Sequence, residues 1–161
     1  MMQDPARALD ELRTVLNVND NAFSRASAHF MMATTHAFMQ QPAEALAAAE
    51  RAYEGAPWHP RIIGFLAGLL AQAGQHQRAD ALIAKLREAA TVNGVQGGTI
   101  QLGMVQYRWA MGDVDGSIAW LEKAVEQREP LAVVFAGILP AEQVRSNPRW
   151  RALRRTMNLE P

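Results

Sequence analysis

The sequence contains no cysteine, few aromatic side chains, no net charge and no long uninterrupted apolar run. Without cysteine the chain forms no disulfide and has no thiolate chemistry. Its 16 basic and 16 acidic residues balance, so it has no general attraction to nucleic acid or to anionic lipid. The longest apolar run, residues 62–71, is interrupted by Gly64 and Gly68 and is well short of the roughly 20 residues that cross a membrane.

The composition is instead that of a folded helical chain. Hydrophobic residues make up 49% of the sequence and charged residues 20%, which argues against both a disordered chain and a membrane protein. The length of 161 residues fits one domain. Residues 1–7 include an acidic residue and no apolar segment, so they do not resemble a signal peptide. We expect a cytoplasmic protein with no membrane partner.

Apolar residues recur with a helical period along the chain. Pro42 suits the first turn of a helix, Gly55 followed by Pro57 ends one, and Gly74 and Gly112 allow tight turns. These signals predict helices over residues 5–18, 22–39, 42–55, 59–73, 76–90, 98–111 and 114–128, with a shorter helix near 148–157. Helices paired through short turns pack antiparallel and stack, so the predicted fold is an all-α solenoid of antiparallel pairs with a C-terminal capping helix.

Ala45 and Ala79 occur in matching sequence contexts, 34 residues apart. This spacing is the period of the tetratricopeptide repeat, and residues 26–59 and 60–93 resemble two such repeats. In that family small residues let the two helices of a pair approach, and larger residues fill the gap to the next pair. The resemblance implies packing positions at His29, Met32, Ala33, His36, Ala45, Ala49, Ala52, Ile63, Leu66, Ala67, Leu70, Ala79, Ile83 and Leu86, and a right-handed superhelix overall.

The remaining residues extend this array into a single domain over 1–161. Residues 98–130 resemble a third repeat, in which Ser117 occupies the alanine position 38 residues after Ala79. The four extra residues are expected near 93–98. Residues 5–20 resemble the second helix of a partial repeat, and residues 131–161 are expected to form the C-terminal cap.

The end of the chain carries a second resemblance. Residues 119–130 and 144–159 are similar to a recurrent ending of bacterial multidomain proteins, in which tetratricopeptide repeats follow a winged-helix activator, a nucleotide cyclase or a protein kinase domain. The chain departs from that pattern because residues 138–144 lack the usual aspartate–proline pairs. The resemblance implies a scaffold in a signalling or transcription regulator, which binds a protein or peptide or positions an effector domain.

The predicted first helix has an apolar stripe of Leu9, Leu12, Val15 and Leu16. With no preceding helix this stripe would be only partly covered, which favours a chain that is the C-terminal piece of a longer protein. Alternatively, the helix is itself a cap and packs entirely on the second helix. A homodimer through this helix is a further hypothesis.

In tetratricopeptide arrays the first helix of each pair lines the concave surface. Phe30, Phe38 and Trp109 are predicted on faces of such helices that carry no packing residues, whereas Trp58 and Trp120 are predicted to pack. The alternative is that the first three fill gaps in an irregular array. By this resemblance the candidate groove for a partner, or for a small molecule in a ligand-sensing domain, consists of Phe30, Thr34, Phe38, Arg61, Gln72, Gln106 and Trp109.

No pattern in the sequence indicates catalysis, a metal or a cofactor. The histidines lack the spacing of convergent ligands, no serine has a nucleophile-elbow motif, and no phosphate-binding loop is present. We therefore expect no enzyme. Five arginines lie between Arg145 and Arg155, but Trp150, Leu153 and Met157 form a buried stripe on the same helix, so the arginines are interpreted as solvated rather than as a nucleic-acid contact.

Overall fold

The computed structural model describes residues 4–92, 100–138, 144 and 146–159, and regular structure within these ranges is entirely α-helical. This confirms the predicted all-α solenoid. The helices, in chain order, are α1 (Pro5–Val18), α2 (Ala22–Phe38), α3 (Pro42–Gly55), α4 (Pro60–Gln72), α5 (His76–Val92), α6 (Ile100–Ala110), α7 (Val114–Glu126), α8 (Leu131–Ile138) and α10 (Pro148–Thr156).

Helix starts follow from local sequence. The side chains of Asp4, Asn21, Asp113 and Asn147 each accept a hydrogen bond from a backbone N–H in the first turn of the helix that follows. Such caps replace a partner that the first N–H groups of a helix lack. Proline occupies the first turn of α1, α3, α4 and α10, where its missing N–H costs no hydrogen bond.

Among the described residues, five helix ends share one type of turn, closed by a residue with positive φ: Gln40, Gly74, Gly112, Arg128 and Asn158. In each turn, the N–H of the next residue donates to a carbonyl oxygen five residues earlier, at 2.9 Å. This is the Schellman arrangement, which satisfies a free carbonyl at the helix end. Glycine adopts positive φ without strain, whereas the other three residues carry a side chain there.

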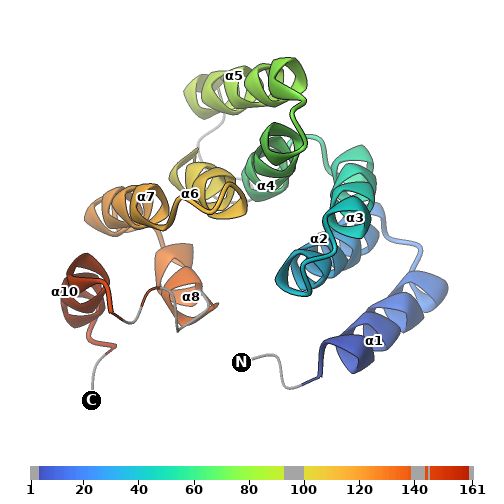
Figure 1. Cartoon of the computed structure of the whole chain (residues 1–161), viewed down its shortest axis with the longest axis horizontal. Helices are drawn as coiled ribbons and strands as arrows, with labels where there is room; N and C mark the ends of the chain where they lie inside the picture. The colour runs from blue at the N-terminus through green and yellow to red at the C-terminus, as the bar shows by residue number, and fades with distance from the viewer. Residues whose placement is uncertain (1–3, 93–99, 139–143, 145, 160–161) are drawn as a thin grey trace.

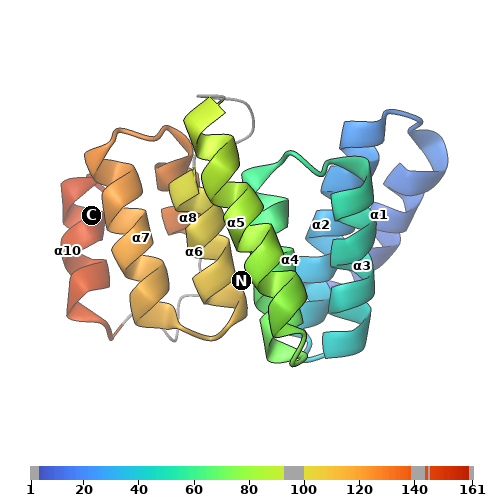
Figure 2. The same ribbon diagram turned by 90° about the horizontal axis from the view of Figure 1, so that it is seen from above.

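The helices are arranged as an arc (Figure 1). Helices α2, α4, α6 and α8 follow the inner side of the arc, and α3, α5 and α7 lie outside them. Seen from above, the helices stand side by side, with α1 at one end of the row and α10 at the other (Figure 2). The inner helices are the first members of successive pairs, as the repeat resemblance implies.

Most of the predicted packing positions lie in the core, whereas His29, Met32 and His36 are only half-buried. All four repeat alanines at 33, 45, 49 and 52 are no more than 1% exposed, and the predicted positions in α4 and α5 are at most 7% exposed. Ser117, at the alanine position of the third unit, is buried, and its hydroxyl donates to the carbonyl oxygen of Val105 at 3.1 Å. A serine is therefore tolerated because a backbone acceptor pairs with its hydroxyl.

Helices α4 and α6 meet almost backbone to backbone. A Cβ atom on Gly64 would lie only 1.9 Å from the carbonyl oxygen of Gly103, and one on Gly68 would lie 2.5 Å from the Cβ of Ala110. No side chain fits at such distances. The two glycines that interrupt the apolar run of α4 are therefore contact points between repeats.

The structure differs from the sequence prediction in two places, at helix α8 and at Trp58. Helix α8 was not predicted, because its segment from Leu131 has a nearly continuous apolar sequence with no helical period. Trp58 is 48% exposed, because it lies in the turn between α3 and α4 rather than on a packing face. Trp120 is half-buried and packs against two core clusters, as predicted. The expected insertion at 93–98 lies outside the described residues.

Helix α1 is partly covered by α2. Leu9 is 5% exposed and Leu12 and Leu16 are half-buried, but Val15 is 37% and Val18 78% exposed. The alternative in which the whole apolar face of α1 packs on α2 is therefore wrong. One part of that face contacts α2 and another part is open to solvent.

Candidate functional site

The seven predicted groove residues differ widely in exposure. Phe38 is 53% exposed and Gln72 is also exposed, whereas Phe30 is only 8% exposed. The other four, all half-buried, are Thr34, Arg61, Gln106 and Trp109. None of the seven lines either of the two clefts described below.

Phe30 and Trp109 do not lie on faces free of packing, and that expectation is wrong. The ring of Phe30 meets Phe65 of α4 edge to face at a centroid distance of 5.6 Å, and the guanidinium of Arg61 lies 5.2 Å from its centroid. Trp109 packs against the core of α6, α7 and α10. Both side chains fill gaps between helices, which was the alternative interpretation. Burial lowers the pKa of Arg61.

The exposed face of α2 remains as a surface for a partner. Met31 and Phe38 are 55% and 53% exposed and lie seven residues apart, which places them on one side of the helix. Thr34 lies between them, half-buried. Helix α2 itself lies on the inner side of the arc (Figure 1). Met31 was missed because only aromatic and polar residues were considered as contacts.

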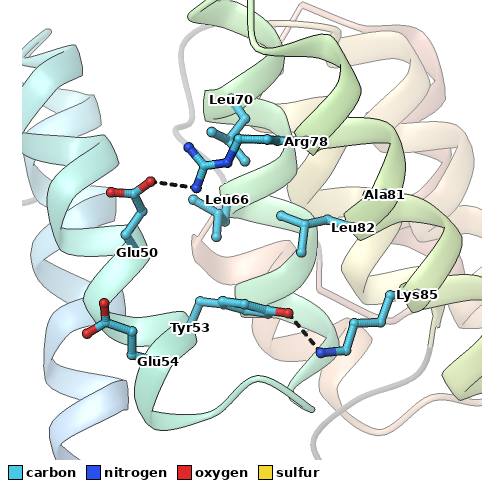
Figure 3. Close-up of a pocket in the computed structure, with 9 residues that line it drawn as sticks. All are labelled: Glu50, Tyr53, Glu54, Leu66, Leu70, Arg78, Ala81, Leu82 and Lys85. Carbon is cyan, nitrogen blue, oxygen red and sulfur yellow. Dashed lines mark hydrogen bonds and ion pairs between the residues drawn. The ribbon is translucent and has the colours of Figure 1, made fainter.

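A first cleft, of about 530 Å³, lies between α3 and α5 with α4 beneath it (Figure 3). Its apolar floor is formed by Leu66 and Leu70, which are at most 2% exposed. The full lining consists of Glu50, Tyr53, Glu54, Leu66, Leu70, Arg78, Ala81, Leu82 and Lys85.

The polar groups of this first cleft are mostly paired with one another. The guanidinium of Arg78 donates to Glu50 at 2.9 Å, and the ammonium of Lys85 donates to the hydroxyl of Tyr53 at 2.8 Å. Both pairs connect α3 to α5 (Figure 3). Glu54 has no hydrogen bond or ion pair with another described residue. The polar side chains of this cleft therefore mainly join two neighbouring repeats to each other.

A second cleft, of about 760 Å³, lies where α1 ends, α2 begins and α3 ends. Its lining consists of Leu16, Asp20, Ala22, Arg25, Ala26, His29, Arg51, Glu54 and Gly55. The guanidinium of Arg25 donates to the carbonyl oxygens of Leu16 and, at 3.4 Å, of Asn19. These carbonyls belong to the end of α1, where no N–H from the helix reaches them. Arg25 therefore fixes the end of α1 to α2.

His29 is a half-buried titratable group of the second cleft. Its Nδ1 atom is buried and has no hydrogen-bond partner among the described residues. Burial lowers the pKa of His29, and the positive charges of Arg51 and Arg25 lower it further, against the opposing effect of Glu54. The imidazole is therefore neutral at neutral pH, and a neutral ring donates from one nitrogen only.

Exposed aromatic rings cluster beside the turn between α3 and α4. Phe23 stacks on Trp58 at a centroid distance of 5.6 Å and on His59 at 5.8 Å. Phe23 is 45% and Trp58 48% exposed. Burial, and then the charge of Arg61, lower the pKa of His59 to about 4. The cluster is anchored by a neutral histidine and presents two rings to solvent.

The basic C-terminal helix is held by local contacts. Trp150 and Leu153 are buried and Met157 packs against them, as predicted. Arg149 pairs with Glu122 of α7 through two hydrogen bonds, and Arg154 donates to the carbonyl oxygen of Leu159 at 2.7 Å. The hydrogen bonds that Arg149 donates to Glu122, and then the charge of Glu122, raise the pKa of Arg149. Arg149 therefore ties α10 to α7, whereas Arg154 closes the end of α10 on the residues that follow it.

Neither a metal centre nor a membrane span is found in the part of the chain that the structure describes. No three carboxylate or imidazole groups there are close enough together to hold a metal ion. None of the described helices combines the length and the apolar character that crossing a bilayer requires.

Comparison with known proteins bears on the central repeats. Residues 39–94 match the tetratricopeptide repeat family model. The match runs from the end of α2 through α5 and includes both Ala45 and Ala79. It supports a tetratricopeptide repeat protein, a class whose repeats generally mediate protein–protein interaction. No curated protein matches the chain, and neither does any solved structure.

Proposed function

We propose that this chain is a non-catalytic scaffold that binds a protein or peptide, or positions an effector domain, within a bacterial cytoplasmic regulator of signalling or transcription. The observation that carries the binding role is the match of residues 39–94 to the tetratricopeptide repeat. The regulatory setting rests on the resemblance of residues 119–130 and 144–159 to the ends of such regulators. The proposal includes one domain over 1–161, with repeats at 26–59, 60–93 and 98–130, a partial repeat at 5–20 and a cap at 131–161.

The partner surface is proposed on the inner side of the arc. Phe38, with Met31 beside it, supplies exposed apolar area on α2, and Gln72 at the end of α4 supplies an exposed amide. Thr34, Arg61, Gln106 and Trp109 are half-buried and can contribute their exposed edges. An apolar strip with polar groups around it suits an amphipathic helix or an extended peptide.

The test is affinity capture followed by measurement of binding to each captured partner. We expect Phe38→Ala to weaken binding at least about fivefold, since central aromatic contacts typically contribute more than 1 kcal/mol. Phe38 is exposed, so the melting temperature should stay unchanged. Trp109→Ala is a poorer probe, because Trp109 packs in the core and its loss would also reduce stability.

Phe23→Ala is the matched control. It removes an equally exposed ring, 45% against 53%, from the other end of α2. Equal loss of binding in both variants would refute the inner surface as the binding site. The inner surface would also be refuted if the partner bound the wild type and Phe38→Ala with the same affinity.

Self-association through α1 is a second proposal, favoured by the exposure of Val15 and Val18. Light scattering over a range of concentrations tests it. We expect a mass that rises with concentration in the wild type and stays at 17.7 kDa in Val18→Glu, because a charge disfavours apolar contact. A monomeric wild type at every concentration rules the proposal out.

A further inference from the structure

The two clefts differ in how their polar groups are paired. In the first, Arg78 pairs with Glu50 and Lys85 with Tyr53. In the second, Arg25 is engaged with the end of α1, and the charges of Arg51 and Glu54 act on His29. Asp20, Arg51 and Glu54 belong to none of the ion pairs among the described residues. Binding sites present unpaired polar groups in a concave surface, so the second cleft is the better candidate for a ligand.

The unpaired groups carry both signs of charge. Arg51 and Glu54 lie three residues apart on α3, which puts them on neighbouring positions of one helix face. Arg51 supplies a guanidinium suited to two-point contact with a carboxylate, and Glu54 and Asp20 supply acceptors for an ammonium group. A simple anion or a simple cation would use only half of these groups, whereas a zwitterion uses both.

The helix ends that border the cleft favour the same polarity. The N-terminus of α2, at Ala22, carries a partial positive charge that attracts a carboxylate. The C-terminus of α3, near Gly55, carries partial negative charge that attracts an ammonium group, whereas the end of α1 is already occupied by the guanidinium of Arg25. Helix ends and side chains are thus complementary to one kind of ligand.

We propose that the cleft bounded by α1, α2 and α3 binds a small zwitterion of amino-acid or dipeptide size. Its carboxylate would be held by Arg51 and by His29, and its ammonium group by Glu54, with Asp20 at the rim. Because the Nδ1 atom of His29 is buried, Nε2 is the nitrogen that meets the ligand, as a donor. The volume of about 760 Å³ is within the range of small-molecule sites. The site is independent of the protein partner proposed above.

Isothermal titration calorimetry with the dipeptide alanyl-alanine tests the proposal. We expect saturable binding to the whole chain, lost or weakened at least about tenfold when the dipeptide is N-acetylated or when its carboxylate is amidated, since each change removes a charged hydrogen bond. Amide chemical-shift changes in a nuclear magnetic resonance titration should centre on Ala22, Ala26 and Gly55. No heat up to about 10 mM, or equal binding of the blocked forms, would overturn the proposal.

Variants separate this cleft from the first one, because Glu54 borders both. Arg51→Gln and Glu54→Gln should each weaken binding at least about tenfold. Both side chains are exposed, so circular dichroism melts should match the wild type. Two exposed residues of α5 give the controls: Lys85→Gln alters only the first cleft, and Arg87→Gln removes a charge outside both. Loss of binding in Lys85→Gln, or its retention in Arg51→Gln, would refute the site.

Discussion

Helix α4 is joined to its neighbours in two different ways. Towards α2 the contact is made by large side chains, with Phe30 against Phe65 and the guanidinium of Arg61 over the Phe30 ring. Towards α6 the contact is made by backbone, because Gly64 and Gly103 leave no room for a Cβ atom. The 34-residue repeat therefore does not imply equivalent joints.

The difference matters for how the array transmits strain. At the α4–α6 joint the backbone contact leaves little room for adjustment, and Ile63 of α4 and Met104 of α6 lie in one core cluster beside it. A joint of ring and guanidinium can adjust by rotation of its side chains. We therefore expect the α4–α6 joint to be the rigid one and the α2–α4 joint to be the place where the curvature of the arc can change.

The largest effect is expected at the rigid joint. Gly64→Leu would force α4 and α6 apart and should lower the free energy of unfolding by more than about 4 kcal/mol, as measured by urea denaturation. The control is Ala84→Leu on the exposed side of α5, which should change stability by less than about 0.5 kcal/mol. Similar stabilities for the two variants would refute the close α4–α6 contact.

The side-chain joint should respond to loss of volume. Phe30→Ala leaves a cavity against Phe65 and should cost about 3 kcal/mol in urea denaturation. Phe30→Leu keeps much of the volume and should cost less than about 1.5 kcal/mol. Equal losses in the two variants would mean that the ring is not packed as a filler between α2 and α4.

The start of α4 should make the side-chain joint sensitive to pH. The pKa of His59 falls from its ordinary value of 6.5 to about 4, through burial and then Arg61. Between these values the unfolded chain binds more protons than the folded chain, so stability is lost as pH falls from 6.5 towards 4. We expect wild type to lose about 1 kcal/mol more than His59→Gln between pH 7 and pH 5, allowing for partial exposure. Thermal melts at the two pH values measure this. An equal loss of stability in the two proteins would contradict the prediction.

The smallest effect is expected in the turns of the two central pairs. Gln40 and Gly74 occupy the same left-handed position, with φ of 57° and 75°. Gln40→Gly should raise the free energy of unfolding by about 0.5–1 kcal/mol, and Gly74→Gln should lower it by about 1 kcal/mol, since a side chain is strained at that φ. Thermal melts measure both. Changes of the same sign would show that the two turns are not equivalent.

Local sequence predicted the helices well because their ends depend on nearby residues. Helix α3 has the predicted bounds, 42–55, and α2 and α4 end within a residue of theirs. The left-handed residues Gln40, Arg128 and Asn158 were not predicted, because glycine is the usual sequence signal for such a turn. Helix α8 was not predicted because an apolar run without period fits a buried strand as well as a helix.

The candidate binding groups were harder to predict than the fold. Phe30 and Phe38 are the same residue type, eight positions apart on one helix, yet one is 8% and the other 53% exposed. The outcome depends on how closely α4 approaches α2, which a repeat pattern does not specify. Likewise, the mixed-charge cleft brings together Asp20, His29 and Glu54 from three segments, which no local motif relates.

By itself, the sequence determined the helical period, the helix starts, the small residues of each pair and the 34-residue repeat between Ala45 and Ala79, because these depend on backbone sterics and on contacts within one repeating unit. Only the tertiary structure decided which apolar side chains stay exposed, how α4 meets each neighbour and where unpaired charges gather. Those features depend on the distances and angles between helices, which arise from packing over the whole array.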